Sequence, residues 1–388
     1  MITVRVTRKG ADRVLSGHPW IFSSDVADRN CAQPGAPVRV VDPKDRVIGT
    51  AHFSDSSQIT LRMLSGQAET IDRVWFRKRL EAAIEYRRRF VTGTNAYRLV
   101  YSEADQLPGL IVDRYGDYLV VQTLNQGMDR AKAEIIECLS DLLRPAAIVL
   151  RNDVPVRTKE NLPLESAVIS GSAPDQVLVE MNGLKWHVDL LHGQKTGIFL
   201  DQRENYPAAA AAARGRALDC FTFAGGFALH LAKTCDSVVA IDSSTDSLAL
   251  ARRNADVNGV PNVEFRQEDV FEALTRYSRG GHPAEFDTVV LDPPAFTKTR
   301  SAIEGAARGY RDINQRALRL LRPGGILVTC SCSHHFTEAM LLETVASAAL
   351  DAHRTVRVIE RRTQAQDHPI LLTVPETHYL KCLILHVL

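Results

Sequence analysis

The feature that most constrains the fold is a regular alternation of strand and helix patterns in the C-terminal half. After Tyr206, apolar runs such as 216–221, 237–242 and 286–292 are separated by segments with helical spacing. A chain that alternates in this way forms a mostly parallel sheet with helices on both faces. The final apolar run, 379–388, is expected to be an antiparallel edge strand. We therefore predict an α/β domain here.

Two further modules precede this domain. Residues 1–71 contain short apolar stretches separated by Gly, Pro and Asp, which is typical of a small β-rich module. A basic helical pattern then runs from Asp72 to about Phe90, followed by strand, helix and strand patterns. Strands before and after the helix predict that residues 72–188 form an α+β middle domain, not half of a Rossmann fold. The third domain is expected to span residues 189–388.

Composition limits the class of protein only loosely. The chain has 388 residues, of which 45% are hydrophobic, and a formal net charge of +1, so charge must be read locally. It shows no signal-peptide pattern and no apolar run long enough to span a membrane. The seven cysteines are scattered and form no CxxC pair, which argues against a disulfide framework and a zinc site. We expect a cytoplasmic protein with no membrane partner and no bound metal.

Acidic residues end three successive strands of the predicted sheet. Asp219 precedes the glycine pair at Gly225, Asp242 ends the second strand, and Glu268 and Asp269 end the third. A carboxylate at the second position can accept hydrogen bonds from both ribose hydroxyls, and one at the third can hold an adenine amino group. The pattern lacks the G-x-G-x-x-G cradle of dinucleotide sites. Acids suit a cationic sulfonium better than a pyrophosphate, so the pattern favours S-adenosylmethionine.

Two loops at the carboxyl ends of later strands are candidates for the chemistry. One loop, 292–296, reads Asp-Pro-Pro-Ala-Phe, and its prolines fix the backbone beside a flat substrate. The other contains Cys330 and Cys332. Carbon methylation of a pyrimidine needs a thiolate that adds at C6, and Cys332, nearer the loop, is the better candidate. Cys330 is interpreted as a buried sheet residue. Enzymes that methylate exocyclic base amines use a similar Asp-Pro-Pro loop, so that alternative stays open.

Together with motifs elsewhere, these residues resemble a family of bacterial ribosomal RNA methyltransferases. Its members have an N-terminal PUA domain, a middle α+β domain and a C-terminal Rossmann-like domain, and the best characterised kind makes 5-methylcytosine in large-subunit ribosomal RNA. The resemblance covers nearly the whole chain. The motifs that carry it are Lys9-Gly10, Gly17–Phe22, Glu103–Asp105, Leu107–Asp113, Gly193–Gly197, Phe199–Arg203, the Asp219 loop, Asp292–Pro294 and Ser331–Ser333.

The resemblance implies a class I methyltransferase domain with a mostly parallel seven-stranded sheet and S-adenosylmethionine as cofactor. It implies Cys332 as the nucleophile, and we expect Asp292 to support the cytosine ring at N3. The implied cofactor-binding residues are Gln202, Asp219, Phe221, Gly225, Asp242, Asp269 and Asp292. One departure is Ala295, which stands where enzymes with a proline-cysteine loop carry a second cysteine for product release. Product release must then use another base, or the substrate differs from cytosine. The base that removes the C5 proton is not identified.

The expected partner is ribosomal RNA of the large subunit, free or in a precursor particle, and a homodimer is left open. The helix ending near Phe90 is read either as a solvated face or as a phosphate-contacting surface. The residues expected to contact RNA are Lys9, His18, Trp20, Arg87, Arg88, Arg89 and Lys195. A binding or ribosome-assembly factor without turnover is the alternative from another class.

Overall fold

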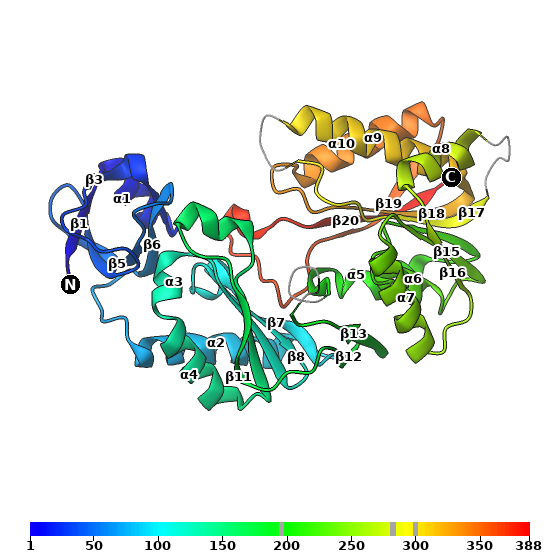
Figure 1. Cartoon of the computed structure of the whole chain (residues 1–388). Coiled ribbons are helices and arrows are strands. Elements are labelled where there is room, and N and C mark those ends of the chain that lie inside the picture. The colour runs from blue at the N-terminus through cyan, green and yellow to red at the C-terminus, as the bar shows by residue number, and fades with distance from the viewer. Residues whose placement is uncertain (192, 194–197, 280–284, 298–301) are drawn as a thin grey trace. The chain divides into compact units, whose positions relative to one another are not determined.

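A computed structural model describes residues 1–191, 193, 198–279, 285–297 and 302–388. The chain divides into two compact units (Figure 1). The first unit comprises Met1–Glu180, Val188–Ile198 and Gln366–Thr377, and the second comprises Met181–His187, Phe199–Ala365 and His378–Leu388. Within the described part of the chain, no helix has the length and apolar character needed to cross a membrane.

The first unit begins with a six-stranded sheet in the order β2-β6-β5-β4-β1-β3. Its pairs are antiparallel except β1 with β4. The helix α1 starts after Thr7, whose hydroxyl caps it by accepting a hydrogen bond from the Gly10 amide. Valines and other aliphatic residues, among them Val4, Val38 and Leu61, fill a small core. The elements are β1 (Thr3–Val6), α1 (Arg8–Leu15), β2 (Trp20–Phe22), β3 (Val26–Asp28), β4 (Pro37–Val41), β5 (Val47–Phe53) and β6 (Ile59–Ser65).

The middle part of the same unit is a five-stranded sheet, β11-β10-β9-β8-β7, with helices packed on it. The apolar face expected on the basic helix exists, because Phe76, Leu80 and Ile84 of α2 are buried in this core. The elements are α2 (Arg73–Phe90), β7 (Ala96–Tyr101), β8 (Leu110–Tyr115), β9 (Tyr118–Thr123), α3 (Gln126–Arg130), α4 (Lys132–Leu143), β10 (Ala147–Arg151) and β11 (Ser166–Gly171). A hairpin of β12 (Val177–Met181) and β13 (Leu184–Val188) follows.

Arg87 departs from its predicted role. The side chain is 1% exposed, and its guanidinium forms an ion pair with Asp105 and donates to the carbonyl oxygens of Arg98 (2.9 Å) and Asp367 (2.8 Å). Asp367 belongs to the returning segment Gln366–Thr377 of this unit. With its donors committed inside the fold, Arg87 holds that segment in place and does not reach RNA phosphate.

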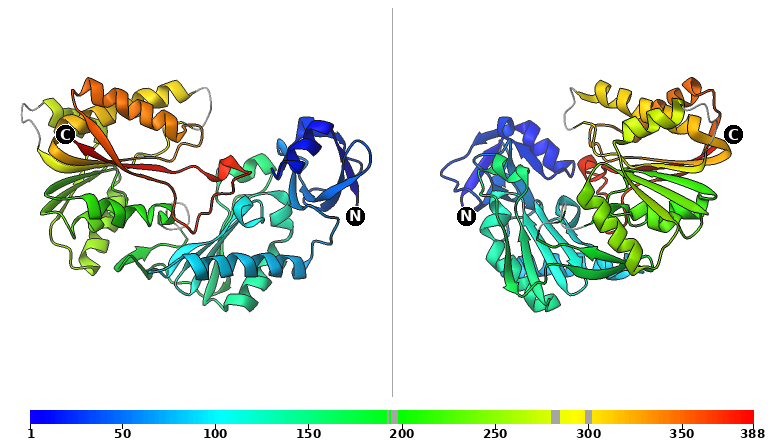
Figure 2. Two further views of the ribbon diagram at one scale, coloured as in Figure 1. Left: turned by 180° about the vertical axis from the view of Figure 1, so that it is seen from behind. Right: turned by 45° about the vertical axis from the view of Figure 1, so that its right-hand side comes forward.

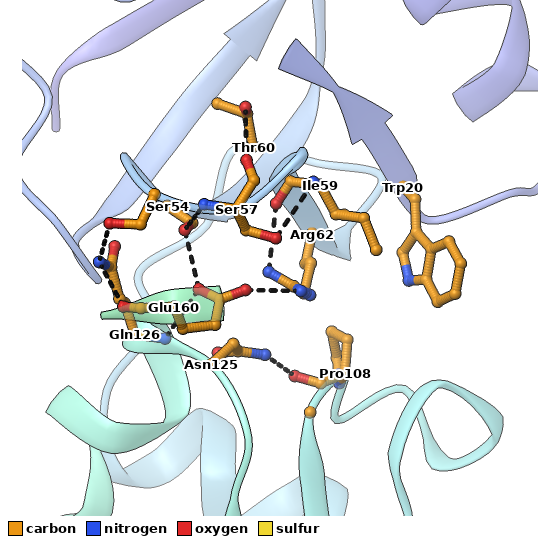
Figure 3. Close-up of polar contacts among 12 residues, drawn as sticks. Trp20, Ser54, Ser57, Ile59, Thr60, Arg62, Pro108, Asn125, Gln126 and Glu160 are labelled. Carbon is orange, nitrogen blue, oxygen red and sulfur yellow. Dashed lines mark hydrogen bonds and ion pairs between the residues drawn. The ribbon is translucent and has the colours of Figure 1, made fainter. Parts of the chain in front are cut away.

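A buried carboxylate joins the N-terminal sheet to the middle part of the first unit (Figure 3). Glu160, at the end of the short helix Pro155–Glu160, is fully buried. It forms an ion pair with Arg62 of β6 (2.8 Å) and accepts a hydrogen bond from Ser54 (2.8 Å). Gln126 adds a second bridge, since its amide donates to Asp55 (2.7 Å) and to the Glu160 carbonyl (3.0 Å). These contacts tie the two sheets together.

The second unit contains the sheet that the sequence predicted, with seven strands in the order β16-β15-β14-β17-β18-β20-β19. Helices α8, α9 and α10 cover one face and α5, α6 and α7 the other (Figure 1 and, from other sides, Figure 2). The strands are β14 (Arg216–Cys220), β15 (Ser237–Asp242), β16 (Val263–Gln267), β17 (Phe286–Leu291), β18 (Leu321–Ser331), β19 (Val356–Arg362) and β20 (Lys381–Val387). The helices are α5 (Asn205–Ala212), α6 (Gly226–Leu231), α7 (Thr245–Val257), α8 (Val270–Arg279), α9 (Ile303–Leu320) and α10 (Glu338–Asp351).

The last strand is antiparallel, as expected, but it is not at the edge. β20 pairs with β18 on one side and β19 on the other. Its residues are almost all buried, whereas those of β19 are mostly exposed. The continuous apolar run of β20 is the pattern of an internal strand, and the charged β19 is a typical protected edge.

We expect Glu160→Ala to destabilise the first unit by about 3–5 kcal/mol, because it leaves the Arg62 guanidinium largely buried without its charge partner. The free energy of unfolding in urea, followed by tryptophan fluorescence, measures this. Glu85→Ala removes the carboxylate of an exposed pair with Arg88 and should cost less than about 1 kcal/mol. Equal effects of the two substitutions would contradict a structural role for Glu160.

Candidate active site

A buried carboxylate lies near the carboxyl end of β14, and a strained loop follows the strand. Asp219 is fully buried, and its Oδ2 accepts hydrogen bonds from the Thr222 hydroxyl (2.6 Å) and the Ala228 amide (3.0 Å). The loop backbone is strained, because Phe221 and Phe223 have φ values of 64° and 49°. Non-glycine residues rarely adopt this left-handed region, and such strain concentrates at functional sites.

One carboxylate oxygen of Asp219 accepts no hydrogen bond from the described residues. This oxygen, Oδ1, is buried. Burial raises the pKa of this carboxyl to about 7, the Thr222 hydroxyl opposes that rise, and the nearby charge of Asp292 adds to it. A cation placed here would stabilise the carboxylate and satisfy the orphaned oxygen. The local chemistry therefore fits a positively charged ligand.

The carboxylate of Asp242 is fixed in orientation at the end of β15. Its Oδ2 accepts a hydrogen bond from the Phe223 amide and its Oδ1 one from the Ser244 amide, both at 2.9 Å. Each carboxylate oxygen can accept a second hydrogen bond, so both remain able to bind hydroxyl groups. Asp269 is exposed and accepts a hydrogen bond from the Glu272 amide (3.0 Å), which fixes the start of α8.

Asp292, which follows β17, is connected to Gln202 by a direct hydrogen bond. The Gln202 amide donates to Asp292 Oδ1 (2.9 Å), and the Asn205 amide donates to Gln202 Oε1 (2.6 Å). Arg362 of β19 donates in turn to Asn205 Oδ1 (3.0 Å). The structure thus brings together two residues expected at the cofactor. It adds Asn205, three residues after Gln202, and Arg362, which is too far away in sequence to be found by motif.

The two chemistry loops meet as their strand order predicts. Cys332 follows β18 directly and is half-buried, with its Sγ 3.9 Å from the Pro293 carbonyl oxygen of the Asp-Pro-Pro loop. Cys330 lies inside β18 and is fully buried, as expected, and burial raises its thiol pKa well above the usual range. Of the two cysteines, Cys332 is therefore the accessible one.

Sequence reasoning missed Lys381, the first residue of β20. Its side chain is 3% exposed, and Nζ donates to the carbonyl oxygens of Ser333 (2.7 Å) and Tyr379 (2.8 Å). Burial lowers the pKa of this ammonium to about 8, against the opposing effects of Cys332 and Glu338. The only sequence signal was a lysine at the start of an otherwise apolar internal strand.

The residues expected to contact RNA differ in their surroundings within the first unit. Lys9 is exposed, with Asp25 3.6 Å away. His18 lies 3.2 Å from Glu376, and the Trp20 indole donates to Glu103 (2.8 Å). The remaining candidates are exposed Arg88 and Arg89, buried Arg87, and Lys195, which lies outside the described residues.

Two protein-family models match this chain. Residues 160–383 match a model described as S-adenosylmethionine-dependent methyltransferase, and residues 4–66 match a PUA-like domain. The first match spans more than half of the chain, and it contains every candidate cofactor residue and Cys332.

Curated relatives match over nearly full length. The chain is 41% identical to ribosomal RNA large subunit methyltransferase I of Erwinia tasmaniensis, over 98% of each protein. It is 40% identical to the protein of that name from Escherichia coli, over 97% of each. Among solved structures, a candidate S-adenosylmethionine-dependent methyltransferase from Streptococcus mutans shares the fold, at 22% identity, with a TM-score of 0.84 and full coverage of both chains. The chain belongs to the S-adenosylmethionine-dependent methyltransferase family, in the group of the ribosomal RNA large subunit methyltransferase I proteins.

Proposed function

We propose that this enzyme makes 5-methylcytosine in large-subunit ribosomal RNA and that Cys332 is its nucleophile. The observation that carries the proposal is the position of the Cys332 thiol, half-buried and 3.9 Å from the Pro293 carbonyl of the Asp-Pro-Pro loop. The names of the full-length relatives and the PUA-like match support ribosomal RNA as the substrate. Such a substrate puts the reaction in the cytoplasm.

Several residues around the strand ends would hold the methyl donor. Asp242 would accept the ribose hydroxyls, Asp269 would lie at the adenine, and Asp219 would face the cationic part of the donor. Further contacts are assigned to Gln202, Phe221, Gly225 and Asp292. S-adenosylmethionine supplies the methyl group that the cytosine accepts.

The chain's own part in the reaction begins with the thiolate. Cys332 adds to C6 of a cytosine drawn out of its stack, while Asp292 supports the ring at N3. The addition makes C5 nucleophilic enough to accept a methyl group. A base then takes the C5 proton, the C6–S bond breaks and the thiolate leaves. Because Ala295 offers no second thiol at this loop, product release uses another group.

Asp242→Ala should weaken S-adenosylmethionine binding by about 1.5–3 kcal/mol, the range for losing hydrogen bonds to a charged group. Isothermal titration calorimetry measures the affinity directly. Asp246→Ala, which removes an exposed carboxylate four residues later, is the matched control and should bind the donor normally. Unchanged affinity in Asp242→Ala would remove this residue from the donor site.

For RNA binding, we expect Arg88→Gln with Arg89→Gln to weaken affinity and to lower the salt slope by about 1.5, because two phosphate contacts are lost. Donor binding should not change. Equivalent substitutions at exposed Arg252 and Arg253 in the second unit control for the change in net charge. Filter binding at several salt concentrations gives the slope. An unaltered slope would mean that Arg88 and Arg89 lie on a solvated face of α2 and do not contact RNA phosphate.

Cys332→Ala should abolish methylation while changing donor affinity by less than about 0.5 kcal/mol, since the thiol is assigned to the RNA base and not to the donor. Cys330→Ala should still methylate and lose about 1 kcal/mol of stability. The mechanism is tested by placing 5-fluorocytosine at the target, because fluorine at C5 cannot leave as a proton does. The wild type and Cys330→Ala should then form an RNA–protein adduct that survives denaturant.

Two results would reject the thiolate mechanism: no adduct with the wild type, or methylation by Cys332→Ala. If methyl transfer then occurs on an exocyclic amine, the Asp-Pro-Pro loop is the remaining candidate for the catalytic element. If neither donor binding nor transfer is found, the chain is a binding or assembly factor. Mass spectrometry of ribosomal RNA from a deletion strain identifies the modified base.

A further inference from the structure

We propose that Lys381 is the cationic partner that maintains Cys332 as a thiolate. The proposal rests on the function above, in which Cys332 is the nucleophile, and it assigns Lys381 a positioning role. A thiol at neutral pH is mostly protonated unless a cation or another stabilising group is near. The sequence identified no such group.

The hydrogen bonding of Lys381 places its charge beside the residue that follows Cys332. β18 and β20 are antiparallel, and Lys381 lies opposite Ser331, the last residue of β18. Its Nζ nevertheless donates to the carbonyl oxygen of Ser333, two residues further along the chain. The side chain therefore extends beyond the end of β18, and the ammonium binds the carbonyl oxygen of Ser333, the residue that directly follows Cys332.

Burial makes the charge of Lys381 significant. A lysine that is 3% exposed is unusual without a charged partner. Its Nζ donates to two neutral carbonyls, and among the described residues no carboxylate lies within ion-pair distance of it. An ammonium held in this way still lacks a counter-charge. The Cys332 thiolate supplies one.

The electrostatic effect is mutual. The Cys332 thiolate raises the pKa of Lys381 and partly offsets the effect of burial. Because the two charges interact with a single energy, the ammonium lowers the thiol pKa by the same interaction. With the pKa of Lys381 at about 8, the lysine is still mostly charged at neutral pH, which is where the thiolate is needed.

Two described titratable groups of this region, Glu338 and Tyr310, cannot replace the lysine as a cation. Glu338 of α10 also acts on Lys381, but it is engaged by Arg361. Tyr310 of α9 bonds to the hydroxyls of Ser331 and Ser333, and burial raises its pKa, so it stays neutral.

Two aromatic residues complete the surroundings. His334 stacks on Tyr379, with ring centroids 5.3 Å apart, and the Tyr379 hydroxyl donates to Asp201. Lys381 is a cation that hydrogen-bonds directly to the residue after Cys332. Its two hydrogen bonds also allow a purely structural role, in which it merely ties β20 to that loop.

The experiment measures the titration of the Cys332 thiol in the full chain, without RNA or donor. Iodoacetamide is applied from pH 5 to 10, and peptide mass spectrometry separates alkylation at Cys332 from that at Cys330. The wild-type midpoint should lie below the ordinary value of about 8.5. Lys381→Met should raise it by about one unit or more, so that alkylation at pH 7 slows roughly tenfold.

Controls separate charge from structure. Lys381→Arg retains the charge and should keep most of the wild-type midpoint, while Lys185→Met removes an exposed lysine of the same unit and should leave it unchanged. If Lys381→Met does not fold, Lys381→Gln replaces it, because glutamine is neutral and can still donate to carbonyl oxygens. A folded neutral variant with an unmoved midpoint, or a wild-type midpoint at or above about 8.5, would overturn the proposal.

The outcome is independent of the 5-fluorocytosine experiment. A midpoint that moves with Lys381 while no RNA adduct forms would retain the charge pair and reject carbon methylation. An adduct together with an unmoved midpoint would retain the covalent mechanism and reject the role of Lys381.

Discussion

The site depends on one geometric constraint, which is that parallel strands end at the same edge of their sheet. β14, β15, β17 and β18 are parallel neighbours, so the residues that follow them are brought together although they are far apart in sequence. This places Asp219, Asp242, Asp292 and Cys332 along one edge of the sheet and lets the Pro293 carbonyl approach the Cys332 thiol. The loops differ in sequence and conformation, but the sheet fixes where they start.

The α/β sheet and the acidic residues at its strand ends could be predicted, because strand alternation and polar strand ends are both local patterns. The features that sequence reasoning missed depend on tertiary context. The position of β20 was missed because β19, with its exposed and charged residues, gave too weak a strand pattern to be counted. Lys381 was missed for a related reason, since its importance comes from the strand beside it and not from its neighbours in sequence.

Arg87 shows how a regular pattern can be applied too loosely. Arg87, Arg88 and Arg89 look alike in sequence, but consecutive residues point about 100° apart around a helix. Arg87 follows Ile84 by three residues and Leu80 by seven, which puts it on the apolar face that the same spacing had identified. Its burial was therefore implied by the helix periodicity. Only the partners that compensate its charge, Asp105 and the Asp367 carbonyl, needed the structure.

Two groups of charged side chains in the second unit require counter-charges of opposite sign. Around Asp219, burial raises the pKa of the carboxyl, and the nearby charge of Asp292 adds to the rise, so a cation placed there would stabilise the carboxylate. Near Cys332 the sign is reversed, because the buried ammonium of Lys381 requires an anion. A cationic donor satisfies the first requirement and a thiolate satisfies the second. In the proposed reaction the bound donor therefore meets the first need, and the protein's own Cys332 meets the second.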